Sequence, residues 1–181
     1  MIPLSTKRQI SMKGNFHKES SVPISTQQRQ DWRTPDNFFD YCAFRFGPYT
    51  LDAAASRSNA RCKRFYTEKD DGLIQPWGKN TVWCNPPYKR GSARGWLQKA
   101  HGEMQGGGTR SSLLLPANTS AKWFHDFAVG KCQVFLVKGR LAFDNTVSTA
   151  PFSSVLCVFD PNEKPTISTL TFKEFTKQEI K

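Results

Sequence analysis

The chain lacks the features that mark secreted and membrane-spanning proteins. Its five cysteines, at positions 42, 62, 84, 132 and 157, include no Cys-x-x-Cys pair. We therefore expect free thiols in a reducing cytosol, with no disulfide framework and no zinc site. No apolar stretch approaches membrane-spanning length, and the N-terminus has no apolar core of a signal peptide. These absences predict a cytoplasmic protein with no bound metal.

Acidic residues are also scarce. The 181 residues include 15 Asp and Glu against 26 Lys and Arg, which gives a formal net charge of +11. This charge predicts a polyanionic partner, most simply nucleic acid, although ribosome-bound and membrane-surface proteins are equally basic. The length suits one domain with a full hydrophobic core.

The chain divides into three parts by composition. Residues 1–30 are rich in Ser, Gln and Lys and show no sustained hydrophobic period, which predicts a flexible basic arm. Such an arm either contacts phosphates or is passive, and the sequence leaves both open. Residues 31–160 predict the folded domain, and residues 161–181 predict a polar, weakly structured tail.

Within residues 31–160, apolar strand patterns alternate with amphipathic helix patterns. Strands are expected at 49–51, 64–67, 81–84, 112–116, 133–137 and 153–159, with a short edge piece at 141–143. Helices are expected at 35–46, at 94–104 and from a cap at Thr119 or Ser120 through Phe127, with Thr34 capping the first. This order predicts a three-layer α/β domain whose mostly parallel sheet is flanked by helices and ends in an antiparallel hairpin.

The most informative motif is Asn85-Pro86-Pro87-Tyr88, directly after the apolar run 81–84. Ligands bind at the carboxyl ends of strands in open α/β sheets. An exocyclic amine on a nucleobase is a weak nucleophile because its lone pair is delocalised, and two acceptors aimed at its N–H bonds free that pair. Asn85 offers a side-chain oxygen, Pro86 a carbonyl held stiffly by the two prolines, and Tyr88 a face for an extruded base. A plain turn after a strand is the alternative.

Two other loops carry candidate ligand contacts. Asp52 follows the first strand and precedes Ala53 and Ala54, whose small side chains let a ligand approach the backbone. Asp70 and Asp71 follow the second strand, where carboxylates accept from ribose hydroxyls or an adenine amino group. Tight packing at the alanines and a polar turn at the aspartates are the competing interpretations.

The order of these segments resembles phage-type DNA N6-adenine methyltransferases, the Dam-like group. The motifs are Trp-x-Thr-Pro, Leu-Asp-Ala-Ala-Ala-Ser, Asp-Asp-Gly-Leu, Cys-Asn-Pro-Pro-Tyr, Leu-Leu-Pro-Ala-Asn-Thr-x-x-x-Trp-Phe and Lys-Gly-Arg-Leu-x-Phe, across residues 31–160. The resemblance implies a Rossmann-like class I methyltransferase fold that binds S-adenosylmethionine and methylates adenine in double-stranded DNA. Protection of phage DNA from host restriction nucleases is the purpose that the group suggests.

The resemblance also implies roles for individual residues. A cofactor set comprises the segment expected near the methionine carboxylate, the loop after the first strand and the acidic pair near the adenosine half: Trp32, Thr34, Pro35, Asp52, Ala53, Ala54, Asp70 and Asp71. The catalytic set comprises Asn85, Pro86, Pro87 and Tyr88. The cofactor loop lacks the glycines of the wider methyltransferase superfamily, so this chain departs from the usual pattern there.

The implied mechanism is base flipping followed by direct in-line transfer, without a covalent intermediate or a metal. Basic positions in this region are candidates for phosphate contacts, with a solvated surface charge as the alternative for each of them: Lys89, Arg90, Arg94, Lys122, Lys138 and Arg140. Roughly thirty residues separate Asp52 from Asn85, too few for an inserted target-recognition domain. We therefore expect a short target site or loose specificity.

Other functions fit part of this pattern. N4-cytosine, RNA and protein-glutamine methyltransferases need the same two acceptors, since their substrates present an amine or amide nitrogen. A non-catalytic DNA-binding protein on a methyltransferase scaffold is a further alternative, although the intact Asn85 and acidic loops argue against it.

Overall fold

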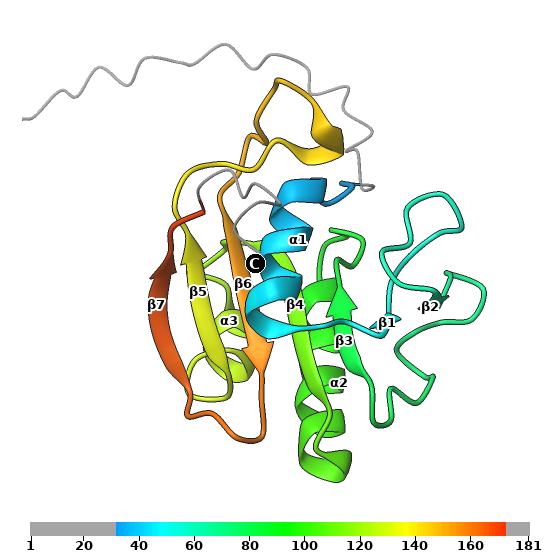
Figure 1. Cartoon of the computed structure of the whole chain (residues 1–181). Coiled ribbons are helices and arrows are strands. Elements are labelled where there is room, and N and C mark those ends of the chain that lie inside the picture. Colours follow the sequence, from blue (N-terminus) through cyan, green and yellow to red (C-terminus); the bar gives the residue numbers. More distant parts are fainter. Residues whose placement is uncertain (1–31, 173–181) are drawn as a thin grey trace, which may run out of the picture.

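The structure, a computed structural model, describes residues 32–172, so the predicted arm at 1–30 lies outside them. Seven strands form one sheet in the order β2-β1-β3-β4-β6-β5-β7 (Figure 1). The strands are β1 (Leu51–Asp52), β2 (Arg64–Phe65), β3 (Thr81–Cys84), β4 (Arg110–Pro116), β5 (Gln133–Val137), β6 (Ser154–Phe159) and β7 (Thr166–Leu170). The helices are α1 (Asp36–Phe46), α2 (Ser92–Gly107) and α3 (Lys122–Phe127), with a short 3₁₀ helix η1 (Phe143–Asn145).

The sheet is mixed rather than uniformly parallel. Strands β2, β1, β3 and β4 are parallel neighbours, whereas β6 runs antiparallel to both β4 and β5. The expected α/β class and antiparallel β5–β6 pair are therefore confirmed. Strand β1 lies between β2 and β3, and the connection from β1 runs to β2 on one side, whereas the connection from β3 runs to β4 on the other. Such a switch point forms a crevice at the carboxyl ends of the strands.

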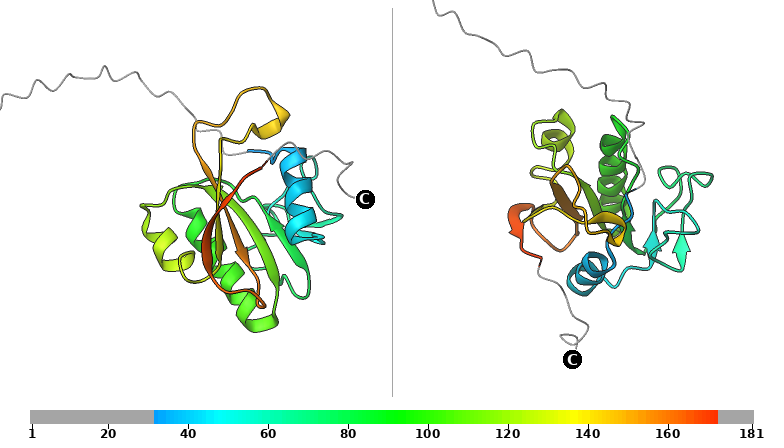
Figure 2. Two further views of the ribbon diagram at one scale, coloured as in Figure 1. Left: turned by 60° about the vertical axis from the view of Figure 1, so that its left-hand side comes forward. Right: turned by 90° about the horizontal axis from the view of Figure 1, so that it is seen from above.

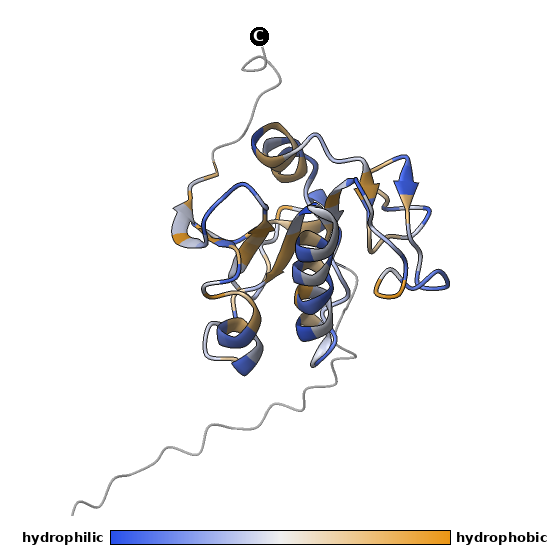
Figure 3. Ribbon diagram, turned by 90° about the horizontal axis from the view of Figure 1, so that it is seen from below, coloured by the Kyte–Doolittle hydropathy of each residue, from blue (hydrophilic) through white to orange (hydrophobic). Residues whose placement is uncertain are grey.

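Helices cover both faces of the sheet (Figure 2, right). Helix α1 packs on one face through Phe38, Cys42 and Phe46, which recur every four residues. Helices α2 and α3 cover the other face. All six residues of β6 are buried, because the strand is covered on both sides. Hydropathy colouring accordingly shows apolar central strands inside polar outer helix surfaces (Figure 3).

Both predicted helix caps are wrong. Pro35 occupies the N-cap position of α1 and makes no side-chain hydrogen bond to the helix. The Asp36 N–H instead donates to Asn145 Oδ1 at 3.0 Å. The hydroxyl of Thr34 is engaged elsewhere, at Asn85. Helix α3 likewise has Ala121 at its cap position and no side-chain cap. Distant or competing partners therefore override the local capping signals.

Two further predictions need correction. The region from residue 161 was expected to be weakly structured, yet Thr166–Leu170 forms β7, paired in parallel with β5. Only Leu170 of these five residues is buried, so this edge strand has almost no hydrophobic signature. Residues 141–143 form no edge strand, because Leu141 and Phe143 both point into the core beneath the β5–β6 connection.

The burial of Leu170 predicts that β7 is an integral part of the fold. We expect Leu170→Ala to lower the free energy of unfolding by about 2–5 kcal/mol through the cavity it leaves. Ile167→Ala on the same strand is the matched control, since that side chain is 54% exposed, and its effect should stay within about 0.5 kcal/mol. Urea unfolding of the two variants measures both, and equal small effects would contradict a packed β7.

Candidate active site

A cleft of about 640 Å³ opens at the switch point of the sheet. This volume lies within the range of roughly 300–1,000 Å³ that small-molecule and cofactor sites occupy. Its walls come from residues 32–34 before α1 and from the loops that follow β1, β2 and β3. Trp96 of α2 lines it too, although most of this side chain is buried in the core.

The cleft brings together most of the residues that the sequence singled out, from four separate segments. Those that line it are Trp32, Thr34, Asp52, Ala53, Ala54, Asp71, Asn85, Pro86 and Pro87. Pro35, Asp70 and Tyr88 are not among its lining residues. Pro35 is buried at the start of α1, and Tyr88 lies behind Asn85.

The two acidic positions after β2 differ in their surroundings. Asp70 Oδ2 accepts from the Thr67 N–H at 2.8 Å and from the Thr67 hydroxyl at 2.7 Å, which closes a turn. These bonds hold the pKa of the exposed Asp70 carboxyl below its ordinary value. Asp71 lines the cleft instead, and one of its oxygens accepts from the Leu73 N–H at 3.1 Å. Of the pair, Asp71 is the one placed to meet a ligand.

Asn85 is held by three hydrogen bonds. Its Nδ2 donates to the Trp32 carbonyl at 2.5 Å and to the Thr34 hydroxyl at 3.0 Å, and its Oδ1 accepts from the Tyr88 hydroxyl at 2.8 Å. Both amide protons are therefore used, whereas Oδ1 retains a second lone pair. The side chain has one orientation, in which its oxygen is the group available to a ligand.

Four aromatic rings gather beside Asn85. Tyr88 and Trp32 each present an edge or a face to both Phe143 and Phe152, with ring centroids 5.1–6.4 Å apart. We call Trp32, Tyr88, Phe143 and Phe152 the aromatic cluster. Burial raises the pKa of the Tyr88 phenol well above its ordinary value, so its hydroxyl stays a donor. The two phenylalanines come from the β5–β6 connection, and no local pattern links them to the Asn-Pro-Pro-Tyr motif.

Asp52 organises the loop that follows β1. Its carboxylate is buried and accepts from the Ala54 N–H at 3.3 Å and from the Arg61 N–H at 3.0 Å. Burial raises its pKa from 3.8 to about 6, although both backbone bonds oppose the shift. The Asp52 carboxylate therefore holds the loop itself through these two hydrogen bonds, and its predicted contact with a ligand stays a prediction.

The loops after β1 and β2 touch through their backbones. A Cβ at Gly72 would lie 2.0 Å from the carbonyl oxygen of Ala53. Only glycine allows this approach, and the small Ala53 side chain sits fully buried at the same contact. The Asp-Asp-Gly sequence after β2 therefore fits against the alanine run after β1, and together they form one wall of the cleft.

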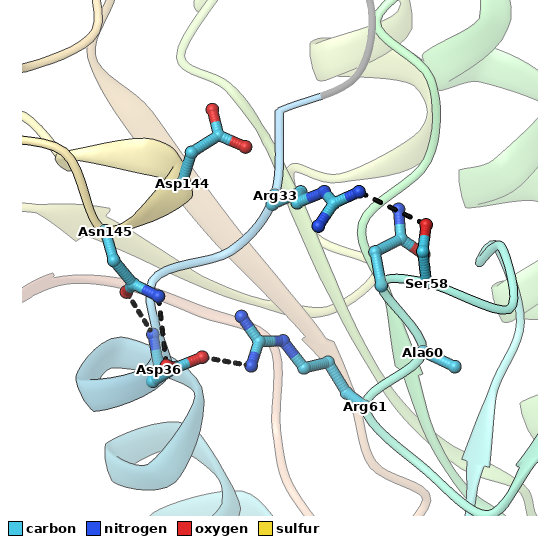
Figure 4. Close-up of a pocket in the computed structure, with 8 residues that line it drawn as sticks. Arg33, Asp36, Ser58, Ala60, Arg61, Asp144 and Asn145 are labelled. Atoms are coloured by element: carbon cyan, nitrogen blue, oxygen red, sulfur yellow. Dashed lines mark hydrogen bonds and ion pairs between the residues drawn. The ribbon is translucent and has the colours of Figure 1, made fainter.

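Two arginines near the cleft were not predicted. The Arg61 guanidinium pairs with the Asp36 carboxylate and the Thr34 carbonyl, and Arg33 donates to the Ser58 hydroxyl at 3.2 Å. Both arginines also line a second, polar cavity of about 530 Å³ beside the start of α1 (Figure 4). No sequence period marks them, because loop geometry alone brings them here.

The predicted phosphate contacts all follow strands that end at the same edge as the cleft. Strands β3, β4 and β5 share one direction, since β6 is antiparallel to both β4 and β5. Each of the six side chains is exposed: Lys89, Arg90 and Arg94 after β3, Lys122 after β4, and Lys138 and Arg140 after β5. Lys89 also lines the cleft and pairs with Glu68 at 3.4 Å.

The remaining predictions on cysteines and metals concern residues that the structure describes. All five cysteines are free. Burial raises the pKa of the Cys84 thiol, next to Asn85, so this group is neutral near pH 7. Between residues 32 and 172, no cluster of His, Cys, Asp and Glu is arranged to hold a metal ion. Within the same range, none of the helices combines the length and apolar character needed to span a membrane.

Comparison with known proteins shows matches over most of the chain. A family model described as DNA N-6-adenine-methyltransferase (Dam) matches residues 21–180. DNA N-6-adenine-methyltransferase of Escherichia phage T1 is 34% identical over 132 residues, which cover 72% of this chain and 53% of the phage protein. "Putative methyltransferase YfdM" of Escherichia coli K12 is 40% identical over 63 residues, which cover 32% of this chain and 69% of that protein. The chain thus spans about half the length of the phage T1 relative.

The raised pKa of Asp52 predicts a pH-dependent stability. Because its pKa of about 6 in the folded chain exceeds the ordinary 3.8, its contribution is largest below about pH 4 and is lost as the pH rises through 6. Relative to Asp52→Asn, which cannot titrate, we expect the unmodified protein to lose about 2 kcal/mol of unfolding free energy between pH 4 and pH 7. Urea unfolding at several pH values measures this, and a constant difference between the two proteins would exclude a titrating Asp52.

Proposed function

The chain belongs to the Dam family of DNA N-6-adenine-methyltransferases, and we propose that it transfers a methyl group from S-adenosylmethionine to the N6 amino group of adenine in double-stranded DNA. The observation that carries this proposal is the fixed amide of Asn85. Its free acceptor lies between a cofactor-sized cleft and a cluster of aromatic rings.

The cleft residues fit S-adenosylmethionine in size and chemistry. Asp71 and Glu68 offer carboxylates to ribose hydroxyls on the β2 side, and the small residues Ala53 and Ala54 leave backbone accessible. Arg33 supplies a guanidinium for the methionine carboxylate in the segment where the family places that group. The crevice between the ends of β1 and β3 supports a Rossmann-like class I arrangement.

Asn85 and Pro86 act on the amine of the target base. When bound, S-adenosylmethionine would supply an activated methyl group on its sulfonium. As the nitrogen lone pair forms the bond to the methyl carbon, the sulfur–methyl bond would break with its electron pair staying on the neutral thioether sulfur, and the nitrogen would then release one proton to solvent. Asn85 Oδ1 accepts a hydrogen bond from one N–H group of the amine, and the carbonyl oxygen of Pro86 accepts a hydrogen bond from the other. As the nitrogen gains positive charge, both bonds strengthen, so they stabilise the transition state more than the ground state.

The aromatic cluster gives the extruded adenine a surface beside these acceptors. Tyr88 and Trp32 offer ring surfaces at the end of β3 and before α1, and their positions are set by Phe143 and Phe152. Bases bind such surfaces through stacking, which is worth about 1–3 kcal/mol per base. The Tyr88 hydroxyl and the incoming amine can share Oδ1, because a carbonyl oxygen has two lone pairs.

The neighbouring thiol takes no part in this chemistry. Cys84 is fully buried and its pKa is raised, so it is neither accessible nor a thiolate. This observation supports direct transfer over a covalent adduct through that residue.

The proposed activity is tested by transfer of tritium from methyl-labelled S-adenosylmethionine to separate DNA, RNA and protein acceptors. We expect label on duplex DNA, in N6-methyladenine after digestion. Label on N4-methylcytosine, RNA or protein would assign the site to one of the alternative substrates. Absence of label on every acceptor would favour a non-catalytic DNA-binding protein.

Removal of the acceptor should abolish most of the turnover. We expect Asn85→Ala to lower the single-turnover rate on adenine-containing duplex by about 10²-fold or more, as for loss of one preorganised polar group. Binding of S-adenosylmethionine, measured by calorimetry, should largely survive. A variant with near-normal turnover would remove Asn85 from the mechanism.

The hydrogen bond from Asn85 to Thr34 makes Thr34 a positioning residue. Thr34→Val keeps the buried shape but leaves one amide proton without its acceptor, so we expect kcat to fall about tenfold, as for loss of about 1–2 kcal/mol of hydrogen bonding.

Thr34→Ser retains the hydroxyl and serves as the matched control, with kcat expected near that of the unmodified protein. The KM for S-adenosylmethionine should change little in either variant. A rise in that KM with unchanged kcat would instead place Thr34 in cofactor binding.

A further inference from the structure

We propose that the β5–β6 loop, residues 138–153, enters duplex DNA and that Val147 at its tip fills the space left in the base stack by the extruded adenine. The inference rests on the proposed function and extends it to the tip of a loop of which the sequence motifs marked only residues 138–143. Only Lys138 and Arg140, at the base of this loop, were expected to contact DNA.

The loop lies beside the catalytic motif. It connects the carboxyl end of β5 to β6, at the sheet edge where β1, β3 and β4 also end. In Figures 1 and 2 it projects beyond the strand ends, next to the start of α1. Phe143 and Phe152 tie it to Tyr88, with ring centroids 6.4 and 5.6 Å away. A duplex whose adenine reaches Asn85 therefore passes close to this loop.

The body of the loop is braced. The Ala150 N–H donates to the Leu141 carbonyl at 2.9 Å, which closes its neck, and both residues are buried. Asn145 accepts from the Asp36 N–H at 3.0 Å and donates to the Asp36 carboxylate at 2.9 Å, which fixes the loop to α1 (Figure 4). An element held in place before binding loses less conformational entropy when DNA arrives.

The tip combines small polar groups with one apolar side chain. Residues 145–149 are all exposed, and Val147 is 103% exposed, so its side chain has no packing partner. The Thr146 hydroxyl, by contrast, bonds back to the carbonyls of Phe143 at 3.0 Å and Ser148 at 3.1 Å. Val147 is thus the outermost apolar group of a loop whose other tip residues are polar.

The charged residues of the β5–β6 loop also favour DNA as its partner. Residues 138–153 include two basic residues, Lys138 and Arg140, which are exposed at the neck, and one acidic residue, Asp144, which precedes the exposed tip. An isolated exposed apolar residue carries no meaning by itself. Here it lies at the tip of a loop whose neck carries two candidate phosphate contacts and whose Phe143 and Phe152 pack against Tyr88 of the catalytic motif. Proteins that open the base stack insert apolar wedges.

The experiment first maps the methylated sites by sequencing of treated DNA, and then uses a synthetic duplex that contains one such site. A second duplex is identical except for a mismatch opposite the target adenine, which lowers the cost of flipping. We compare single-turnover rates of Val147→Ala with those of Ile167→Ala. The exposed Ile167 side chain lies on β7 beside Val134, near the start of β5, whereas the β5–β6 loop follows the end of β5.

We expect Val147→Ala to slow methylation of the paired duplex about tenfold and to approach the normal rate on the mismatched duplex, because the wedge matters only while the base must be unstacked. Ile167→Ala should match the unmodified protein on both duplexes. Both variants should keep their thermal stability, since each truncates an exposed side chain.

The outcomes separate this inference from the proposed function. If the unmodified protein methylates DNA and Val147→Ala behaves like Ile167→Ala, the loop inference is wrong and the proposed function stands. If Val147→Ala slowed methylation equally on both duplexes, the proposed wedge role of Val147 would also be wrong, because an equal loss of rate indicates a general effect on DNA binding. If the unmodified protein transfers no methyl group to DNA, both proposals fail.

Discussion

The hydrogen bonds from the Asn85 amide to the Trp32 carbonyl and the Thr34 hydroxyl are the constraint on which the site depends. They join the end of β3 to the segment before α1, across more than fifty positions of sequence. Because both amide protons are used, the side-chain oxygen has one direction in which to accept. The chemistry of a nucleobase amine requires that direction to be set before the substrate arrives, since reorganisation during the reaction would raise the barrier.

The same segment also connects the cleft to the β5–β6 loop that we assign to DNA. Arg61, beyond β1, binds the Thr34 carbonyl and the Asp36 carboxylate, and Asp36 in turn bonds to Asn145 of the β5–β6 loop. The start of α1 is therefore shared by the cofactor cleft, the Asn85 amide and the loop that we assign to DNA. A disturbance at this point reaches all three, because each of them bonds to this segment directly or through Arg61.

The sequence predicted much of the architecture. The apolar patterns of β3 and β5 predicted their bounds, whereas α2 begins two residues before the expected 94–104 and continues to Gly107, with Gly108 at its C-cap in a left-handed conformation. It failed where a distant partner replaced a local signal. Thr34 looks like a helix cap, but its hydroxyl binds Asn85. Strand β7 buries only Leu170, so no hydrophobic pattern in the sequence predicts its pairing with β5, which is seen only in the tertiary structure.

The sequence by itself determined the acceptor motif, the acidic and alanine loops and the basic charge, because these depend on residue type and on position relative to a strand. Only the tertiary structure decided that Asp71 rather than Asp70 faces the cleft, that Arg33 and Arg61 stand beside it, and that Phe143 and Phe152 pack against Tyr88. The reason is that loops from separate strands meet at one edge of the sheet. Their contacts are set by backbone direction and burial, which have no period in the sequence.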